Sequence, residues 1–192
     1  SGSGVAFSRD ELHGGPEPSG DFLVNAQGED VVAGVRTPRD LRELADSLPH
    51  AHAELLEILR TLERHYGDMQ DTEFTIEEGR LFILQCRAGK RTPLAALQVA
   101  VDLVREGLID EREGVRRLIG IDVEGIRLRR VLGKQIPVAS GTPASGGVAV
   151  GTCAFSVERA EQDAGDGPVV LVRPTASPDD IQGIDAAAGL LV

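Results

Sequence analysis

The chain has 192 residues, of which 41% are hydrophobic and 27% charged, as in a folded protein with one core or two small ones. Its formal net charge of −11 excludes a nucleic-acid scaffold, because an acidic surface repels a polyanion. The sequence has neither an apolar run of the roughly 20 residues that a membrane span needs nor a signal-peptide pattern, so we expect a cytoplasmic protein without a membrane contact. Cys86 and Cys153 lie in apolar runs and are expected in the core.

The first 67 residues predict strands followed by two helices. One helix should begin at the cap Thr37-Pro38 and end at Pro49. A second helix should end at Gly67. Its buried stripe should consist of Leu55, Leu59, Leu62 and Tyr66. Short strands are expected at Val5–Phe7, Phe22–Val24 and Val31–Ala33.

Residues 71–87 predict a β-hairpin in which two alternating runs flank Glu77-Glu78-Gly79. A three-residue loop would put Gly79 at the left-handed last position. Phe74 would then lie opposite Phe82, and Asp71 opposite Gln85 with Glu73 as its diagonal neighbour. A two-residue loop would scatter the polar groups over both faces. The predicted register gives a core face of Thr72, Phe74, Ile76, Phe82, Leu84 and Cys86, and a polar face of Asp71, Glu73, Gln85 and Arg87.

The polar face of this hairpin offers the groups that metal-bound phosphates need. Asp71 and Glu73 supply carboxylates, and Gln85 supplies an amide oxygen. Mg²⁺ prefers such hard oxygens and is commonly held by one or two carboxylates together with substrate phosphates. The planar fork of Arg87 suits a phosphoryl oxygen. The pattern therefore indicates a metal–nucleotide site, and it leaves open a surface face that carries only ion pairs.

The second half of the chain predicts helices and then a parallel α/β unit. Helices should begin at Thr92-Pro93 and at Asp110, the first with an apolar stripe of Leu94, Leu97, Val101 and Val104. Strands are expected at Val148–Phe155, Pro168–Val172 and Gly189–Val192, with a helix capped by Ser177 before the last. Strand, helix and strand in this order imply a parallel crossover. A chain that stops on its last strand is expected to be a fragment.

Around the hairpin the sequence closely resembles the pyruvate, phosphate dikinase family. The resemblance covers most of the chain and is weakest across residues 110–135. Asn25–Pro38 resembles the dikinases more than the related phosphoenolpyruvate synthases. The stretches that carry it are Gly4–Arg9, Asn25–Pro38, Asp68–Gly79, Leu84–Arg87, Gly89–Thr92 and Val170–Pro178.

The resemblance implies a mixed α/β (α+β) chain in three parts. Residues 1–91 would be the C-terminal part of an ATP-grasp nucleotide-binding domain, residues 92–135 a helical connector, and residues 136–192 the N-terminal part of a swivelling β/β/α phosphohistidine domain. The family converts ATP, pyruvate and inorganic phosphate to AMP, phosphoenolpyruvate and diphosphate through a phosphohistidine. Mg²⁺ is thus the expected cofactor, and a homodimer the expected state of the intact enzyme.

The resemblance also implies roles for single residues and leaves alternatives open. Glu73 and Gln85 would face the metal, Asp71 and Arg87 would assist ATP and phosphate, and Glu29 would line the nucleotide site. The family's Gly-Gly-x-Thr-Ser-His motif is absent from the 192 residues, so we expect no phosphoryl transfer by this chain alone. A phosphoenolpyruvate synthase-like fragment and a noncatalytic nucleotide-binding module are the alternatives. The histidines His13, His50, His52 and His65 match no catalytic motif and are expected to face solvent.

Overall fold

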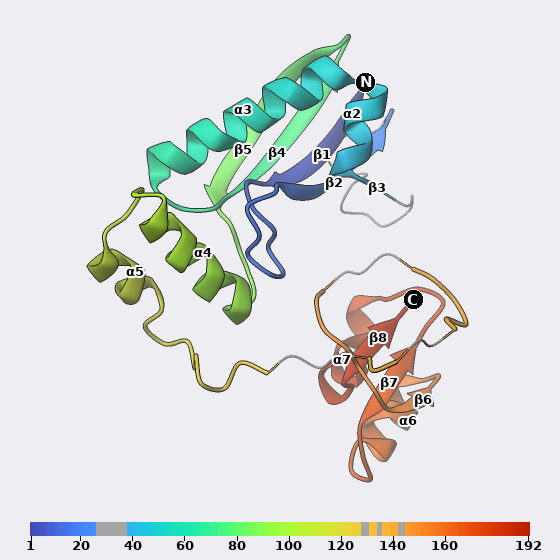
Figure 1. Cartoon of the computed structure of the whole chain (residues 1–192). Helices are drawn as coiled ribbons and strands as arrows, with labels where there is room; N and C mark the ends of the chain where they lie inside the picture. The colour runs from blue at the N-terminus through green and yellow to red at the C-terminus, as the bar shows by residue number, and fades with distance from the viewer. Residues whose placement is uncertain (26–37, 128–130, 134–135, 142–144) are drawn as a thin grey trace. The chain divides into compact units, whose positions relative to one another are not determined.

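The computed structural model describes residues 1–25, 38–127, 131–133, 136–141 and 145–192. The chain divides into two compact units, Ser1–Arg127 and Leu128–Val192, each considered by itself below (Figure 1). The predicted strand Val31–Ala33 and the predicted cap residue Thr37 lie outside the described residues. Both units combine strands and helices, which confirms a mixed α/β chain.

The first unit is built on a five-stranded antiparallel sheet with the order β3-β2-β1-β4-β5. The predicted strands at Val5–Phe7 and Phe22–Val24 are confirmed as parts of β1 and β2. The hairpin forms the neighbouring strands β4 and β5, with β5 at the edge (Figure 1). The strands are β1 (Gly2–Phe7), β2 (Ser19–Val24), β3 (Arg39–Asp40), β4 (Gln70–Glu77) and β5 (Arg80–Ala88).

Helix α3 (Pro49–Tyr66) covers one face of this sheet and closes the core (Figure 1). Its Leu55 and Leu59 are fully buried and belong to the same cluster as Phe74 of β4. As predicted, Gly67 ends the helix in the left-handed conformation. The opposite face of the sheet is free of α3, and it carries the polar side of the hairpin.

The helices before α3 differ from the prediction at their ends. A 3-10 helix, η1 (Leu41–Glu43), and the short α2 (Leu44–Ser47) start at Asp40, whose side chain accepts a hydrogen bond from the Arg42 N–H. Pro49 begins α3 instead of ending the preceding helix, because proline fits the first helical position, where no N–H bond is needed. The buried stripe of α3 continues through Glu63, while Tyr66 is 57% exposed.

A buried polar network fixes the end of β1. Arg9 is 3% exposed and binds the Glu63 carboxylate through Nε at 3.0 Å and Nη2 at 2.8 Å. The same guanidinium reaches Glu106, beyond the last residue of α4, at 2.6 Å. The Ser8 hydroxyl donates to Glu63 and accepts from the Gln70 N–H, directly before Asp71. The network therefore joins the hairpin, α3 and the end of α4.

The ring of Phe74 lies against a glycine in the middle of the sheet. Gly4 of β1 pairs with Phe22 on one side and with Phe74 on the other. A Cβ at Gly4 would lie 2.6 Å from the Phe74 ring and 2.5 Å from the Asp21 carbonyl oxygen. Only a residue without a side chain leaves the aromatic ring this space.

Helices α4 (Pro93–Arg105) and α5 (Glu111–Arg117) complete the first unit. Thr92 and Asp110 cap them through side-chain oxygens, as predicted. The predicted stripe of α4 was wrong: Leu94, Leu97, Val101 and Val104 are only partly buried. The helix instead buries a neighbouring stripe, from which Val99 and Leu103 pack on Met69. The fully buried residues of α4 are Ala95, Val99, Ala100 and Leu103.

The second unit is a three-stranded parallel sheet with the order β6-β7-β8, which confirms the predicted parallel crossover. Strand β6 is shorter than the predicted Val148–Phe155, and Cys153 within it is exposed, contrary to the expectation of a core residue. Cys86 is partly buried. The elements are β6 (Thr152–Ala154), α6 (Val157–Asp163), β7 (Val169–Val172), η2 (Pro178–Asp180), α7 (Ile181–Ala186) and β8 (Gly189–Leu191).

Candidate functional site

The register of the hairpin differs from the predicted one. Glu77 pairs with Arg80, so the loop has two residues, and both take positive φ: Glu78 at 49° and Gly79 at 78°. Positive φ at both central residues is the geometry of a tight type I′ hairpin turn, which matches the twist of the strands. A β-bulge then interrupts the ladder: Phe74 pairs with Ile83, but Glu73 pairs with Gln85.

The bulge moves the apolar residues of β5 and keeps the polar ones together. Leu81 and Ile83 pack against the core, whereas Phe82 and Leu84, predicted for the core, are 40% and 58% exposed. On β4 the predicted core residues Thr72, Phe74 and Ile76 are buried. Beyond the bulge the pairs are Thr72 with Cys86, Glu73 with Gln85 and Asp71 with Arg87. The four predicted polar residues thus share the face opposite α3.

Asp71 and Arg87 form the centre of this polar face. Arg87 Nε donates to Asp71 Oδ2 at 2.7 Å, and its Nη2 lies 4.0 Å from Glu73 Oε1. The hydrogen bond and charge of Asp71 raise the pKa of Arg87 above its ordinary value, with a smaller contribution from Glu73. Gln85 stands opposite Glu73 on the neighbouring strand. The structure therefore brings together two carboxylates, an amide and a guanidinium.

Asp71 carries the observation that points to a ligand. The residue is 4% exposed, and its Oδ1 is buried without a hydrogen-bond partner among the described residues. A buried carboxylate oxygen without a partner is costly, and such groups concentrate where a ligand or an ion completes the bonding. Asp71, Glu73 and Gln85 offer the hard oxygens that suit Mg²⁺.

The donor set fits a metal that shares its ligands with phosphate. No group of three His, Cys, Asp or Glu side chains comes together as a metal site in the described part of the chain. Two carboxylates and an amide leave coordination positions for water and phosphate oxygens, as is usual for Mg²⁺. Glu29, predicted to line the nucleotide site, lies outside the described residues.

Asp21 belongs to the same sheet face, although the sequence did not single it out. Val5 pairs with Asp21 on one side and with Glu73 on the other, so both acids flank it. Partial burial raises the pKa of Asp21, and the charges of Asp40 and Glu11 add to the effect. Alternation along β2, with Phe22 inward, is the signal that could have placed Asp21 outward.

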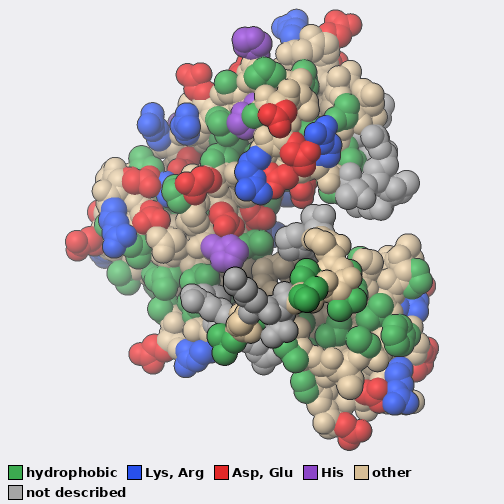
Figure 2. All heavy atoms as spheres, turned by 45° about the vertical axis from the view of Figure 1, so that its right-hand side comes forward, with side chains coloured by type: hydrophobic (Ala, Val, Ile, Leu, Met, Phe, Trp, Pro, Cys, Tyr) green, Lys and Arg blue, Asp and Glu red, His purple; other side chains and the backbone are tan. Residues whose placement is uncertain are grey.

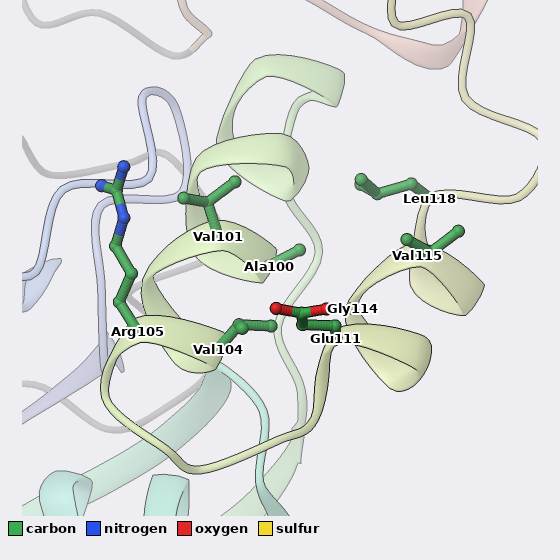
Figure 3. Close-up of a pocket in the computed structure, with 8 residues that line it drawn as sticks. All are labelled: Ala100, Val101, Val104, Arg105, Glu111, Gly114, Val115 and Leu118. Atoms are coloured by element: carbon green, nitrogen blue, oxygen red, sulfur yellow. The ribbon is translucent and has the colours of Figure 1, made fainter.

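Elsewhere on the first unit, charges and grooves have a different character. Figure 2 shows acidic side chains interspersed with Lys and Arg over the visible face. Arg39 and Glu43 form one exposed ion pair of the first unit. Among the described residues, no helix is long and apolar enough to cross a membrane. A groove of about 290 Å³ lies between α4 and α5, and its apolar walls hold none of the predicted site residues (Figure 3). The groove is lined by Ala100, Val101 and Val104 of α4, by Val115 of α5 and by Leu118 directly after α5.

Comparison with known proteins decides which family shares this hairpin. Residues 41–107 match the family described as pyruvate phosphate dikinase, AMP/ATP-binding domain. The whole chain is 49% identical to "Pyruvate, phosphate dikinase, chloroplastic" of Flaveria pringlei, 48% to "Pyruvate, phosphate dikinase 1, chloroplastic" of Arabidopsis thaliana and 47% to "Pyruvate, phosphate dikinase 2" of Zea mays. Over its whole length, the chain is similar to one part of these pyruvate, phosphate dikinases.

This similarity has two immediate consequences for the site. The matched segment of the ATP-binding domain contains Asp71, Glu73, Gln85 and Arg87, whereas Glu29 precedes it. The chain spans 20%, 20% and 22% of the length of these three dikinases, so most of each relative has no counterpart in it.

Proposed function

We propose that this chain forms the part of a pyruvate, phosphate dikinase that holds Mg²⁺ and the phosphates of ATP. The observation that carries the proposal is Asp71, which lies beside Glu73, Gln85 and Arg87 and keeps a buried oxygen without a partner in the described part of the chain. A face with two carboxylates, an amide and an arginine is suited to a metal bridged to phosphoryl oxygens. The family of the matched segment, an AMP/ATP-binding domain, supports the same assignment.

Each residue receives a role from its position. Glu73 and Gln85, paired across the hairpin, would hold the metal. Asp71 would add its free oxygen on the ATP side, and Arg87 would bind a phosphoryl oxygen with its planar fork. Glu29 completes the nucleotide side of the site in the proposal. Bound Mg²⁺ supplies charge neutralisation for phosphoryl transfer.

In the intact protein, we propose the reaction of ATP, pyruvate and inorganic phosphate to AMP, phosphoenolpyruvate and diphosphate through a phosphohistidine. The dikinase names of the relatives support this reaction over that of a phosphoenolpyruvate synthase. Residues 136–192 would begin the domain that carries the histidine, and the intact enzyme would be a homodimer. The cytoplasm remains our expected compartment, and two of these relatives are named chloroplastic, so a fluorescent fusion would test the localisation.

Calorimetric titration of the 192-residue chain with Mg–ATP tests the proposed site. We expect binding that weakens by about tenfold or more in Glu73→Ala and in Gln85→Ala, because each removes a charged or polar ligand contact. Glu77→Ala is the matched control, since Glu77 is exposed at the turn end of the same strand. Equal affinities in all variants would contradict the site.

An ATP/AMP exchange assay tests the expectation that the chain alone transfers nothing. We expect exchange in the presence of Mg²⁺ and phosphate no faster than in the Glu73→Ala control. Exchange above that control would overturn the expectation.

A further inference from the structure

Arg87 lies where the proposed function requires a cation. Its Nε is 2.7 Å from Asp71 Oδ2, and its Nη2 is 4.0 Å from Glu73 Oε1. Both carboxylates are ones that the proposed function directs toward Mg²⁺ and ATP. The positive charge that balances them in this structure therefore comes from the protein itself.

The attachment of Arg87 is weak compared with other arginines of the same unit. Its side chain is 52% exposed, and Nε is the only nitrogen that makes a hydrogen bond to the described residues. Arg9, in contrast, is buried between Glu63 and Glu106, and Arg91 holds Asp68 with both Nη groups at 2.7 and 2.9 Å. A half-exposed guanidinium held through a single nitrogen is readily released.

Only one oxygen of the Asp71 carboxylate accepts a hydrogen bond from Arg87. Asp71 Oδ2 accepts from Arg87, while Oδ1 is buried without a partner among the described residues. A divalent cation carries twice the charge of a guanidinium and takes carboxylate oxygens as direct ligands. It would satisfy the unpartnered oxygen, which Arg87 leaves alone.

We propose that Arg87 acts as a placeholder cation on Asp71, which the incoming metal displaces and thereby frees to bind a phosphoryl oxygen. The inference rests on the proposed function of the hairpin as a Mg–ATP site. No bond other than the hydrogen bond and ion pair of Arg87 is broken in this exchange. It makes metal entry and phosphate capture successive, because the arginine is released only when the metal has replaced it.

Binding of Mn²⁺ alone, followed by paramagnetic broadening of backbone amide signals of residues 71–73 and 85–87, tests the exchange. We expect Arg87→Gln to lower the Mn²⁺ concentration for half-maximal broadening by roughly three- to tenfold, since no internal cation then competes. Arg80→Gln is the matched control: it removes the same charge from the other end of β5, where Arg80 is exposed. Its midpoint should equal that of the wild type.

A second measurement follows the arginine itself. The ¹⁵Nε signal of Arg87, identified by its loss in Arg87→Gln, should shift when Mg²⁺ saturates the site and should not shift in Asp71→Asn. A signal that stays in place while Mg²⁺ binds would overturn the placeholder role.

The outcomes separate this inference from the proposed function. If Glu73→Ala weakens Mn²⁺ and Mg–ATP binding while Arg87→Gln behaves as wild type, the placeholder role is wrong and the site stands. If neither Mn²⁺ nor Mg–ATP binds any of the chains, the proposed function fails, and the inference fails with it. Backbone spectra that match the wild type away from the hairpin would establish that each variant is folded.

Discussion

At the scale of single residues, burial decides what each charge contributes. Arg9 and Asp71 are both almost completely buried. Arg9 binds two carboxylates, whereas Asp71 binds one arginine and keeps one oxygen without a partner among the described residues. A buried charge with complete bonding fixes structure, and a buried charge with incomplete bonding is available to a ligand. We therefore expect Arg9 to stabilise the first unit, and Asp71 to bind the ligand of the proposed function.

Removing one partner of the buried arginine should cost much stability. In Glu63→Gln, Arg9 keeps only Glu106, and the Ser8 hydroxyl loses a charged acceptor. We expect a loss of about 3 kcal/mol in the free energy of unfolding, as measured by urea denaturation. Glu43→Gln, which breaks an exposed pair with Arg39, should change it by about 0.5 kcal/mol or less. Similar losses in the two variants would contradict the structural role of Glu63.

Asp21 should make stability depend on pH in a defined direction. Its pKa in the folded protein is raised above the ordinary 3.8 by partial burial and by Asp40 and Glu11. The folded state therefore binds the Asp21 proton more tightly than the unfolded state does. The resulting stabilisation is fully present below pH 3.8 and is lost as the pH rises through the pKa of Asp21 in the folded protein. Asp21→Asn cannot ionise and escapes this loss.

Urea midpoints over a pH series would check this. The midpoint of Asp21→Asn should exceed that of the wild type at pH 7, and the difference should shrink on acidification and vanish below the ordinary pKa of about 3.8. Glu17→Gln, at an exposed loop position, is the control and should follow the wild type. A difference that is constant with pH would have another cause than the ionisation of Asp21.

At the scale of elements, the hairpin shows what alternation predicts and what it misses. The pattern placed the apolar residues of β4 correctly, because that strand alternates without interruption. It failed on β5, because a bulge changes the backbone without leaving a recognisable residue pattern. The predicted polar face was nevertheless right. The shorter loop shifts the register of β5 by one residue, and the bulge shifts it by one more. After a total shift of two residues, Gln85 and Arg87 point to the predicted face again.

Helix packing gives a similar lesson. Helix α4 has two apolar stripes, and the prediction chose the one with the larger residues, which includes Leu94 and Leu97. The structure buries the smaller one, because Ala95 and Val99 allow α4 to approach closely, and Leu103 then packs on Met69. Such a choice depends on residues distant in the chain, which periodicity within one helix cannot report.

The bulge predicts that Leu84 can be replaced or deleted without turning the polar face. Leu84→Ser should change stability by about 0.5 kcal/mol or less, because this side chain is more than half exposed. Deletion of Leu84 should remove the bulge and keep Gln85 opposite Glu73 and Arg87 opposite Asp71, so Mg–ATP binding should persist. Calorimetry and urea denaturation of both variants would test this, and loss of Mg–ATP binding after the deletion would contradict the register.

At the scale of the whole molecule, the five-stranded sheet and helices α4 and α5 form one unit. Besides the Arg9–Glu106 contact, Asp68 binds Arg91 at 2.7 Å and Arg117 of α5 at 3.3 Å. These ion pairs join the start of the hairpin to both helices. The resemblance could suggest helices in this segment, but their attachment to the sheet depends on side-chain contacts between distant residues.

Limited trypsin digestion should separate the two units at one place first. Arg127 is exposed, lies outside the helices and strands, and is the last residue of the first unit. We expect early cleavage after Arg127, because exposed backbone outside regular structure is the preferred substrate of proteases. The 1–127 product should bind Mg–ATP with the affinity of the whole chain, as measured by calorimetry. Initial cleavage within α3 or α4 would contradict the compactness of this unit.

The space that Gly4 leaves for the ring of Phe74 has a consequence for how such sequences diverge. A side chain at position 4 would collide with that ring, and a smaller residue at position 74 would leave a void beside the glycine. The two positions should therefore change together during evolution, although 69 residues separate them in the chain. Since Phe74 directly follows Glu73, the glycine within β1 becomes a correlated marker for an intact hairpin of the proposed metal site.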